Sequence, residues 1–171
     1  MGLSKVAFVA SGGFGNIHPG EDPDLSIRLW KLGFETKLFS RAYVYHKRRI
    51  DWRKFEIQVG KFGKARPILN SWYPEYAKIT YFFPSLFIIG FYMAVLTAVV
   101  GFFHLLVLYA AYFLTILIVA SVQNQSIKIG LYSVFAVWKQ FYGYGNGFLN
   151  SYVKIIILKR KPRTVFPELF F

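Results

Sequence analysis

Three carboxylates, those of Glu21, Asp22 and Asp24, stand close together in the run Gly20-Glu21-Asp22-Pro23-Asp24. A carboxylate can take a proton from a hydroxyl group when it lies near that group and is partly desolvated. Structural roles compete with this chemistry. Asp22 is a good helix N-cap, Pro23 suits the first helical position, and the helix dipole favours acidic residues at a helix start. Glu21 precedes this cap, so we expect it to project from the end of the loop.

A glycine-rich loop, Ser11-Gly12-Gly13-Phe14-Gly15-Asn16, precedes these carboxylates. The apolar residues 5–10 predict a short buried strand that runs into it. Gly12, Gly13 and Gly15 would let the backbone approach a ligand closely, or would simply allow a tight turn. The spacing alone favours the turn.

The elements that must position these residues can be read from the flanking pattern. Leu25, Leu29 and Leu32 share one face of a helix that starts near Asp22 and ends at Gly33. Two strands are predicted near residues 35–39 and 41–45, and they lead to His46. A lone histidine is more often structural than functional.

A basic amphipathic helix is predicted next. Asp51 is its N-cap, and the helix runs from residue 52 to about 65, where Pro67 stops it. Apolar residues follow one face and lysines surround the rest, so the helix should lie along a bilayer surface. Gln58 and Lys61 belong to this helix.

A long uncharged segment follows: the 49 residues between Lys78 and Lys128 contain no Asp, Glu, Lys or Arg. A helix needs about 20 apolar residues to cross the hydrocarbon core. The segment therefore predicts a transmembrane hairpin, with helices at 79–99 and 102–122 and a turn at Gly101. Lys and Arg flank both ends of the hairpin and are missing from its turn, so the positive-inside rule places residues 1–78 and 128–171 on the cytoplasmic side.

The C-terminal segment has a helical pattern that glycines interrupt. Apolar residues recur at helical spacing from residue 126, and Gly143, Gly145 and Gly147 then break the pattern. We predict a helix in the membrane interface, a bend at the glycines and a second short helix that ends at the basic cluster 159–161. A third membrane crossing would also fit this segment.

Composition supports a protein at a membrane surface. Of the 171 residues, 55% are hydrophobic, yet the formal net charge is +13. The absence of cysteine excludes disulfides, thiolate metal sites and cysteine nucleophiles. The basic charge follows no single recognition element and no nucleic-acid motif is present, which disfavours nucleic acid as the partner.

The order of these features resembles family 2 glycosyltransferases, which have the GT-A fold. The features are the glycine loop, Glu-Asp at a helix start, the run "RLWKLGF", paired strands that end in "AYVYH", an interface helix and a membrane hairpin. The chain looks most like bacterial enzymes that build exopolysaccharide or lipid-linked sugars at the inner membrane. The resemblance spans nearly the whole chain, although only the first 70 residues carry motifs.

The resemblance implies roles for single residues. Residues 11–16 would be the glycine loop beside the donor. Glu21 or, preferably, Asp22 would be the catalytic base that takes the proton of the acceptor hydroxyl. His46 would approach the metal or the donor diphosphate.

The resemblance also extends to the interface helix. Gln58-Val59-Gly60-Lys61-Phe62 stands where processive members of the family carry Gln-x-x-Arg-Trp. Lys for Arg and Phe for Trp are departures from that motif, so transfer of a single sugar fits better than processive synthesis.

One family element is not present before Glu21, namely the Asp-x-Asp that holds Mg²⁺ or Mn²⁺ with the donor diphosphate. Asp22-Pro23-Asp24 matches Asp-x-Asp in sequence, but it lies at the start of the predicted helix and so cannot be that motif. We therefore predict that the chain is the C-terminal part of such an enzyme, inactive without an N-terminal nucleotide-binding half.

The predicted architecture is α/β, a partial GT-A fold followed by membrane helices. Its parts are the end of the catalytic domain (1–50), the interface helix region (51–78), the transmembrane hairpin (79–122), and interfacial helices with a basic tail (123–171). The expected partners are a nucleotide-sugar, a lipid-linked or polysaccharide acceptor and the membrane. The alternatives are a non-catalytic anchor or assembly subunit with a basic cytoplasmic face and, less favoured, a charge-driven binder of lipid or nucleic acid.

Overall fold

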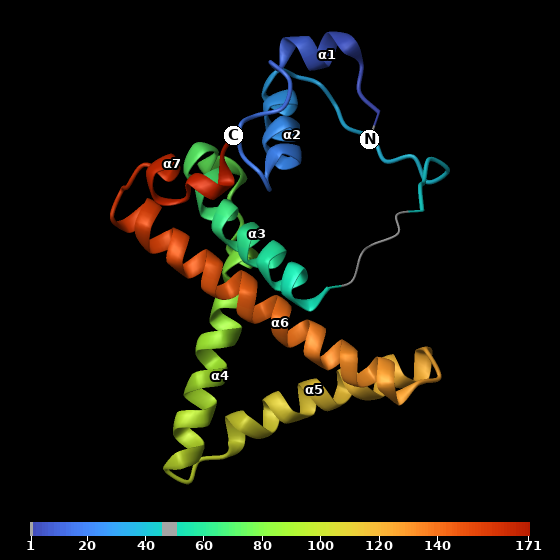
Figure 1. The fold of residues 1–171 in the computed structure, drawn as a ribbon, viewed down its shortest axis with the longest axis vertical. Helices are drawn as coiled ribbons and strands as arrows, with labels where there is room; N and C mark the ends of the chain where they lie inside the picture. Colours follow the sequence, from blue (N-terminus) through green and yellow to red (C-terminus); the bar gives the residue numbers. More distant parts are fainter. Residues whose placement is uncertain (1, 46–50) are drawn as a thin grey trace.

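The computed structural model describes residues 2–45 and 51–171, and this part of the chain is helical (Figure 1). The helices are α1 (Lys5–Ala10), α2 (Glu21–Lys31), α3 (Trp52–Trp72), α4 (Phe83–Val99), α5 (His104–Gln123), α6 (Ile127–Ser151) and α7 (Pro162–Val165). Short helical turns are η1 (Pro74–Tyr76), η2 (Ile79–Phe82), η3 (Tyr152–Ile157) and η4 (Pro167–Leu169). The only β pairing in the described residues is an isolated bridge between Ile17 and Phe170.

The predicted α/β architecture is therefore wrong. Residues 5–10, predicted as a strand, form α1, and Ser4 caps this helix by accepting a hydrogen bond from the Ala7 N–H at 3.2 Å. Residues 35–39 and 41–45 form no strand, and Leu38 and Val44 are almost fully exposed. A strand needs a neighbour for its backbone N–H and C=O groups. Among the described residues no neighbouring strand exists, whereas a helix satisfies these groups locally.

The helix α3 begins where the sequence predicted but extends farther. Asp51 caps it, since its Oδ1 accepts hydrogen bonds from the N–H groups of Arg53 (2.8 Å) and Lys54 (3.1 Å). The helix does not stop at Pro67 but continues to Trp72. A proline inside a helix costs about 3 kcal/mol. Pro67 is fully buried beside Ile68, so burial of this stretch offsets that cost.

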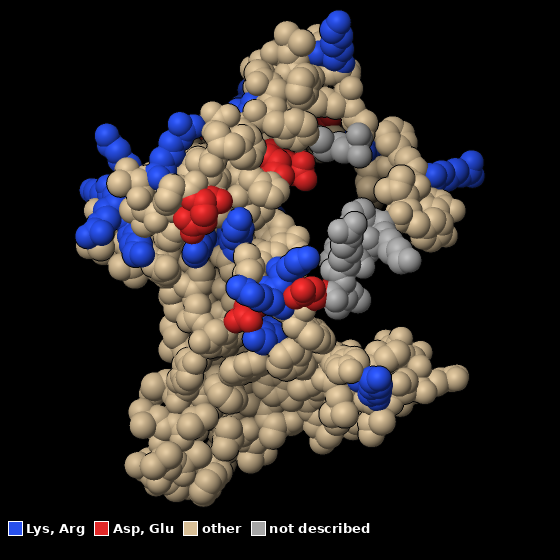
Figure 2. Space-filling view, viewed as in Figure 1, with Lys and Arg blue, Asp and Glu red and all other residues tan. Residues whose placement is uncertain are grey.

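Two helices are long and apolar enough to cross a membrane: the stretch Ile79–Val99, which contains α4, and α5. No residue of α5 is buried within the chain. The two helices diverge from the turn near Gly101, and α6 lies across the open end of the V that they make (Figure 1). Charged side chains gather above this V, around α3 and α7, and are nearly missing from its arms (Figure 2).

The helix α6 passes without a break through Gly143, Gly145 and Gly147, so the predicted bend and second helix are wrong. These glycines are contact points. Gly143 faces Val59 and Gly147 faces the backbone of Gly60 on α3. Small residues let two helix backbones approach closely, and the missing side chains thus serve packing rather than chain reversal.

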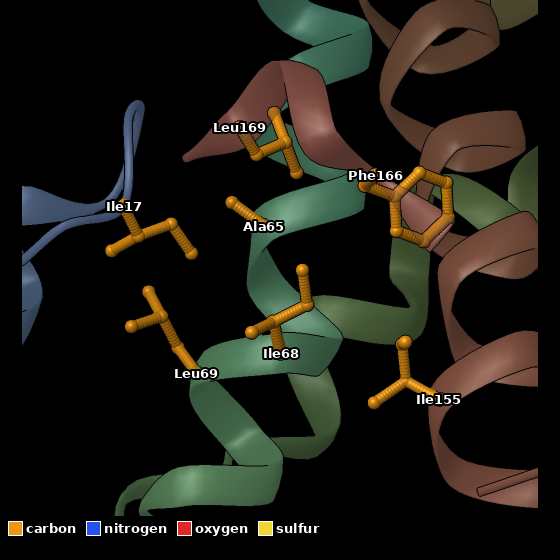
Figure 3. Packing of buried hydrophobic residues seen from close by; sticks show 7 residues of the cluster. All are labelled: Ile17, Ala65, Ile68, Leu69, Ile155, Phe166 and Leu169. Atoms are coloured by element: carbon orange, nitrogen blue, oxygen red, sulfur yellow. The ribbon is translucent and has the colours of Figure 1, made fainter. Parts of the chain in front are cut away.

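The C-terminal residues complete the main core. Its buried members are Ile17, Ala65, Ile68, Leu69, Ile155, Phe166 and Leu169 (Figure 3). They come from the loop before α2, from α3, and from the segment after α6. The His18 N–H donates to the Leu169 carbonyl at 2.8 Å. The expected basic tail therefore folds back and holds the loop that precedes the carboxylate cluster.

Candidate functional site

A cavity of about 470 Å³ lies between the start of α2 and the N-terminal half of α3. It brings together two segments that are more than thirty residues apart in the sequence. Its lining residues are His18, Pro19, Gly20, Glu21, Asp22, Pro23, Lys54, Ile57, Gln58, Lys61 and Phe62. Four of the predicted site residues, Glu21, Asp22, Gln58 and Lys61, thus share one cavity.

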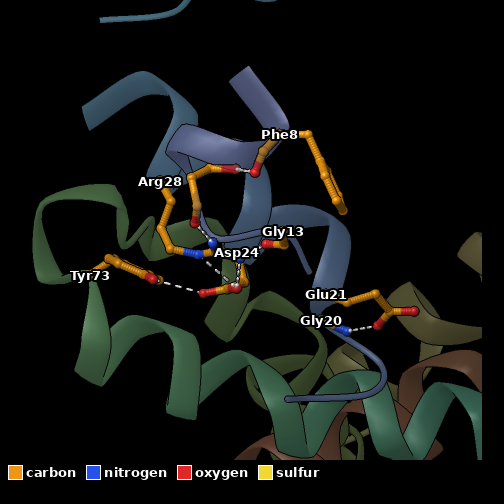
Figure 4. A network of polar contacts seen from close by, with 8 residues as sticks. Phe8, Gly13, Gly20, Glu21, Asp24, Arg28 and Tyr73 are labelled. Atoms are coloured by element: carbon orange, nitrogen blue, oxygen red, sulfur yellow. Dashed lines mark hydrogen bonds and ion pairs between the residues drawn. The ribbon is translucent and has the colours of Figure 1, made fainter. Parts of the chain in front are cut away.

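Glu21 holds the loop at the start of α2. Its two carboxylate oxygens accept hydrogen bonds from the Gly20 N–H at 2.9 Å (Figure 4) and from the His18 ring at 2.8 Å. Burial alone would raise the pKa of Glu21, but hydrogen bonds from its own backbone, from His18 and from Gly20 leave this pKa below its ordinary value. Glu21 is therefore a charged residue already engaged by its neighbours.

Asp22, unlike Glu21, is not engaged by its described neighbours. Gly20, not Asp22, is the N-cap of α2, so the predicted capping role of Asp22 is wrong. The Asp22 residue is exposed and lines the cavity, and none of the hydrogen bonds or ion pairs among the described residues involves its side chain. Its carboxylate is thus available to a ligand in the cavity.

The opposite wall is one face of α3. Lys54, Gln58 and Lys61 follow at spacings of four and three residues, which places them on the same side of the helix. The ion pairs of the described residues include neither Lys54 nor Lys61. Within the part of the chain that the structure describes, the cavity therefore combines a carboxylate without a partner with two ammonium groups that form no ion pair and an amide.

Asp24 is a structural residue at the centre of a polar network with Arg28 and Tyr73 (Figure 4). It is buried, and its Oδ2 accepts from Arg28 Nη2 at 2.7 Å and from Nε at 3.1 Å. The Tyr73 hydroxyl donates to its other oxygen at 2.7 Å. This network joins α2 to the end of α3 and so fixes the spacing between the two walls of the cavity.

The predicted glycine loop does not line the cavity. Its carbonyls at Ser11 and Gly13 accept hydrogen bonds from Arg28. Gly12 and Gly13 have φ values of 74° and 73°, which other residues rarely adopt. A Cβ at Gly15 would collide with the Asp24 carboxylate. In the described structure these glycines allow tight turns around Arg28, the simpler of the two expectations.

His18 was not predicted as a site residue, although it stands only three residues before Glu21. Its ring both bonds Glu21 and lines the cavity. The predicted His46 lies outside the described residues. Within residues 2–45 and 51–171, no group of three or more His, Cys, Asp or Glu side chains could hold a metal ion. The Mg²⁺ or Mn²⁺ expected in the intact enzyme stays a prediction.

Comparison with known protein families, known proteins and solved structures finds nothing that matches this chain.

Proposed function

We propose that this chain supplies the acceptor side and the membrane attachment of an inverting glycosyltransferase. The enzyme would move a sugar from a nucleotide-sugar to a lipid-linked or polysaccharide acceptor. The single observation that carries the proposal is the cavity that joins Glu21 and Asp22 to Gln58 and Lys61. The proposal does not depend on a sheet.

The residues of the cavity suit such a transfer. Asp22, which has no partner among the described side chains, takes the proton of the acceptor hydroxyl. The acceptor oxygen then forms a bond to the anomeric carbon while the bond from that carbon to the diphosphate breaks. Lys61 offers a positive charge to the phosphate of a lipid-linked acceptor, and Gln58 offers an amide to its sugar hydroxyls. Glu21 and His18 keep the loop in place.

We assign donor binding to residues other than those described. The resemblance implies that an Asp-x-Asp motif holds the Mg²⁺ or Mn²⁺ of the donor. That motif does not precede Glu21, and the described residues contain no group of three or more His, Cys, Asp or Glu side chains that could hold a metal ion. No step of the proposed transfer is therefore routed through a metal here.

The proposed setting is the inner membrane of a bacterial cell, with both termini in the cytoplasm. Lys and Arg flank both ends of the hairpin, whereas the turn around Gly101 carries no charge. The cavity then opens on the cytoplasmic side, where nucleotide-sugars are available, and α3 keeps it close to lipid-anchored acceptors.

The test is sugar transfer by membranes from cells that produce the protein, with membranes lacking it as background. Lys61→Gln should slow transfer at least tenfold at limiting acceptor, because a hydrogen bond to a charged group contributes about 1.5–3 kcal/mol. Lys37→Gln is the matched control, since Lys37 is exposed and does not line the cavity. Equal transfer by both variants would contradict the proposed role of the cavity.

A non-catalytic membrane anchor or assembly subunit is the second candidate. The observation that favours it is the large exposed apolar surface of α5, which membrane attachment alone explains. It gives no role to Asp22, whose side chain has no partner among the described residues. Substitution of that residue separates the two candidates.

A further inference from the structure

A second cavity, of about 260 Å³, lies on the other side of Pro23. Pro23 lines both cavities, but the remaining walls differ. The second cavity is bounded by α2, by the C-terminal half of α3 and by the segment that leads to α4. Its lining includes four aromatic residues and two cations, namely Trp30, Tyr73, Tyr76, Tyr81, Arg66 and Lys78.

The two cations of this cavity are not neutralised by carboxylates. The ion pairs of the described residues involve neither Arg66 nor Lys78. Glu75, next to Tyr76, is paired with Lys31 at 2.6 Å. Asp24, which Tyr73 contacts, is paired with Arg28. The acidic groups beside the cavity are thus already engaged, and the cavity has a net positive character.

Arg66 is held in place. Its guanidinium group lies over the Tyr81 ring, 4.3 Å from the ring centroid. Such stacking fixes the plane of the guanidinium. The Tyr144 hydroxyl also contacts this guanidinium, whose five N–H donors leave others able to donate to a ligand. A planar, oriented fork of this kind matches two oxygens of a phosphate group.

The cavity lies next to the membrane-crossing segment. Lys78 directly precedes Ile79, the first residue of the candidate span Ile79–Val99, and Ile79 is 86% exposed. Tyr and Trp side chains are typical of the level where lipid headgroups meet the hydrocarbon. A lipid whose chains lie along α4 would therefore present its headgroup to Arg66 and Lys78.

We propose that this second cavity binds the phosphate of an anionic glycerophospholipid. The net charge of +13 favours a lipid with net negative charge over a zwitterionic one. The site is separate from the proposed acceptor cavity and its occupation does not depend on sugar transfer.

The experiment is native mass spectrometry of the detergent-purified, delipidated chain, titrated with phosphatidylglycerol, with phosphatidylcholine of the same acyl chains, or with inorganic phosphate. Phosphatidylglycerol should bind most tightly. Arg66→Gln/Lys78→Gln should weaken its binding roughly tenfold or more, because two charge-assisted contacts are lost. The control Arg160→Gln/Lys161→Gln removes the same charge from exposed residues outside the cavity and should change binding less than twofold.

Each other outcome contradicts the proposal. Equal losses in both double variants would mean attraction by overall charge, and inorganic phosphate binding as tightly as the lipid would mean a free-phosphate site.

Lysine acetylation of the unchanged chain gives a readout that does not depend on folding of a variant. Phosphatidylglycerol, but not phosphatidylcholine, should protect Lys78 at least threefold more than Lys37, and equal acetylation of Lys78 with both lipids would overturn the assignment.

Discussion

Adjacent carboxylates at the start of α2 have different environments. Glu21 accepts two hydrogen bonds from its own loop, whereas Asp22 faces the cavity without a protein partner among the described residues. Asp24, one half-turn farther, is buried against Arg28. The family resemblance made Glu21 and Asp22 candidates and favoured Asp22, but the sequence did not reveal the different environments of the three carboxylates. The difference depends on Gly20, which has a φ of 134° and is the N-cap of α2, two residues before the cap at Asp22 that the residue preferences indicate.

Tyr73 makes the buried Asp24 network sensitive to alkaline pH. Burial and the hydrogen bond to Asp24 raise the pKa of Tyr73 to about 12 from an ordinary 10.0. A raised pKa means that the folded chain holds this proton more tightly than the unfolded chain. The resulting stabilisation is complete below pH 10 and is lost as the pH rises from 10 to about 12.

Tyr73→Phe should remove this part of the alkaline loss. We expect the apparent melting temperature of the detergent-purified protein to fall more steeply between pH 10 and 12 for the unchanged chain than for the variant. The other titrating groups are common to both proteins and cancel in the comparison. Identical slopes would show that the Tyr73 hydroxyl is not held by Asp24.

At the scale of elements, the crossing of α3 and α6 fixes one wall of the proposed acceptor cavity, the cavity that Glu21, Asp22, Gln58 and Lys61 line. The contact is made by Gly60 and Gly63 on α3 and by Gly143 and Gly147 on α6. The ion pair between Lys139 and Glu56, 2.5 Å long, joins the same two helices. Read along the chain, the glycines of α6 predict a bend. Their role as contact points depends on a partner helix some eighty residues earlier, which the local pattern does not reveal.

Gly63→Ala and Gly60→Ala test this crossing as a matched pair. A Cβ at position 63 would overlap the Tyr144 carbonyl, a backbone atom that cannot turn away, so we expect a loss of about 1–3 kcal/mol of stability. A Cβ at position 60 would meet the Gly143 carbonyl at an ordinary 3.7 Å. That variant should be unchanged or more stable by up to about 1 kcal/mol, since alanine favours a helix.

Melting temperatures and protease resistance of the two purified variants provide the measurement. If Gly63→Ala were as stable as Gly60→Ala, the close approach of α3 and α6 would be wrong.

The absence of cysteine makes the orientation of the hairpin easy to measure. Single cysteines at Lys37 and Val100 report on the segment before α3 and on the turn between α4 and α5. With a maleimide that does not pass the inner membrane, Val100→Cys should be labelled in intact cells. Lys37→Cys should be labelled only after the membrane is opened. The reverse pattern would place the acceptor cavity on the wrong side of the membrane for nucleotide-sugars.

At the scale of the whole molecule, the sequence predicted best what depends on local composition. The uncharged run led to the hairpin, and Asp51 correctly marked the start of α3. The prediction of a sheet was wrong because residues 35–39 and 41–45 would need partner strands for their backbone hydrogen bonds, and the described chain does not supply such strands. The core also joins Ile17 to Leu169 across most of the chain, and such a contact leaves no periodic signal.

The residues of the cavity were predictable in part. Gln58 and Lys61 were predicted from their match to a family motif on an interface helix, and Glu21 and Asp22 from the Glu-Asp pair that the same resemblance implies. That the two helices face each other follows from the core and the Asp24 network. His18 was missed because its role arises only from its contact with Glu21.

The central claim is that Asp22 acts as a base toward an acceptor in this cavity. Asp22→Asn should reduce sugar transfer by membranes of producing cells by about a hundredfold or more, since general base catalysis contributes roughly 10²–10⁴ in rate. Glu35→Gln, which also removes one exposed carboxylate but lies outside the cavity, should transfer at the unchanged rate. Both variants should remain in the membrane fraction. Transfer by Asp22→Asn at the rate of Glu35→Gln would contradict the claim and leave the membrane anchor as the better account of the chain.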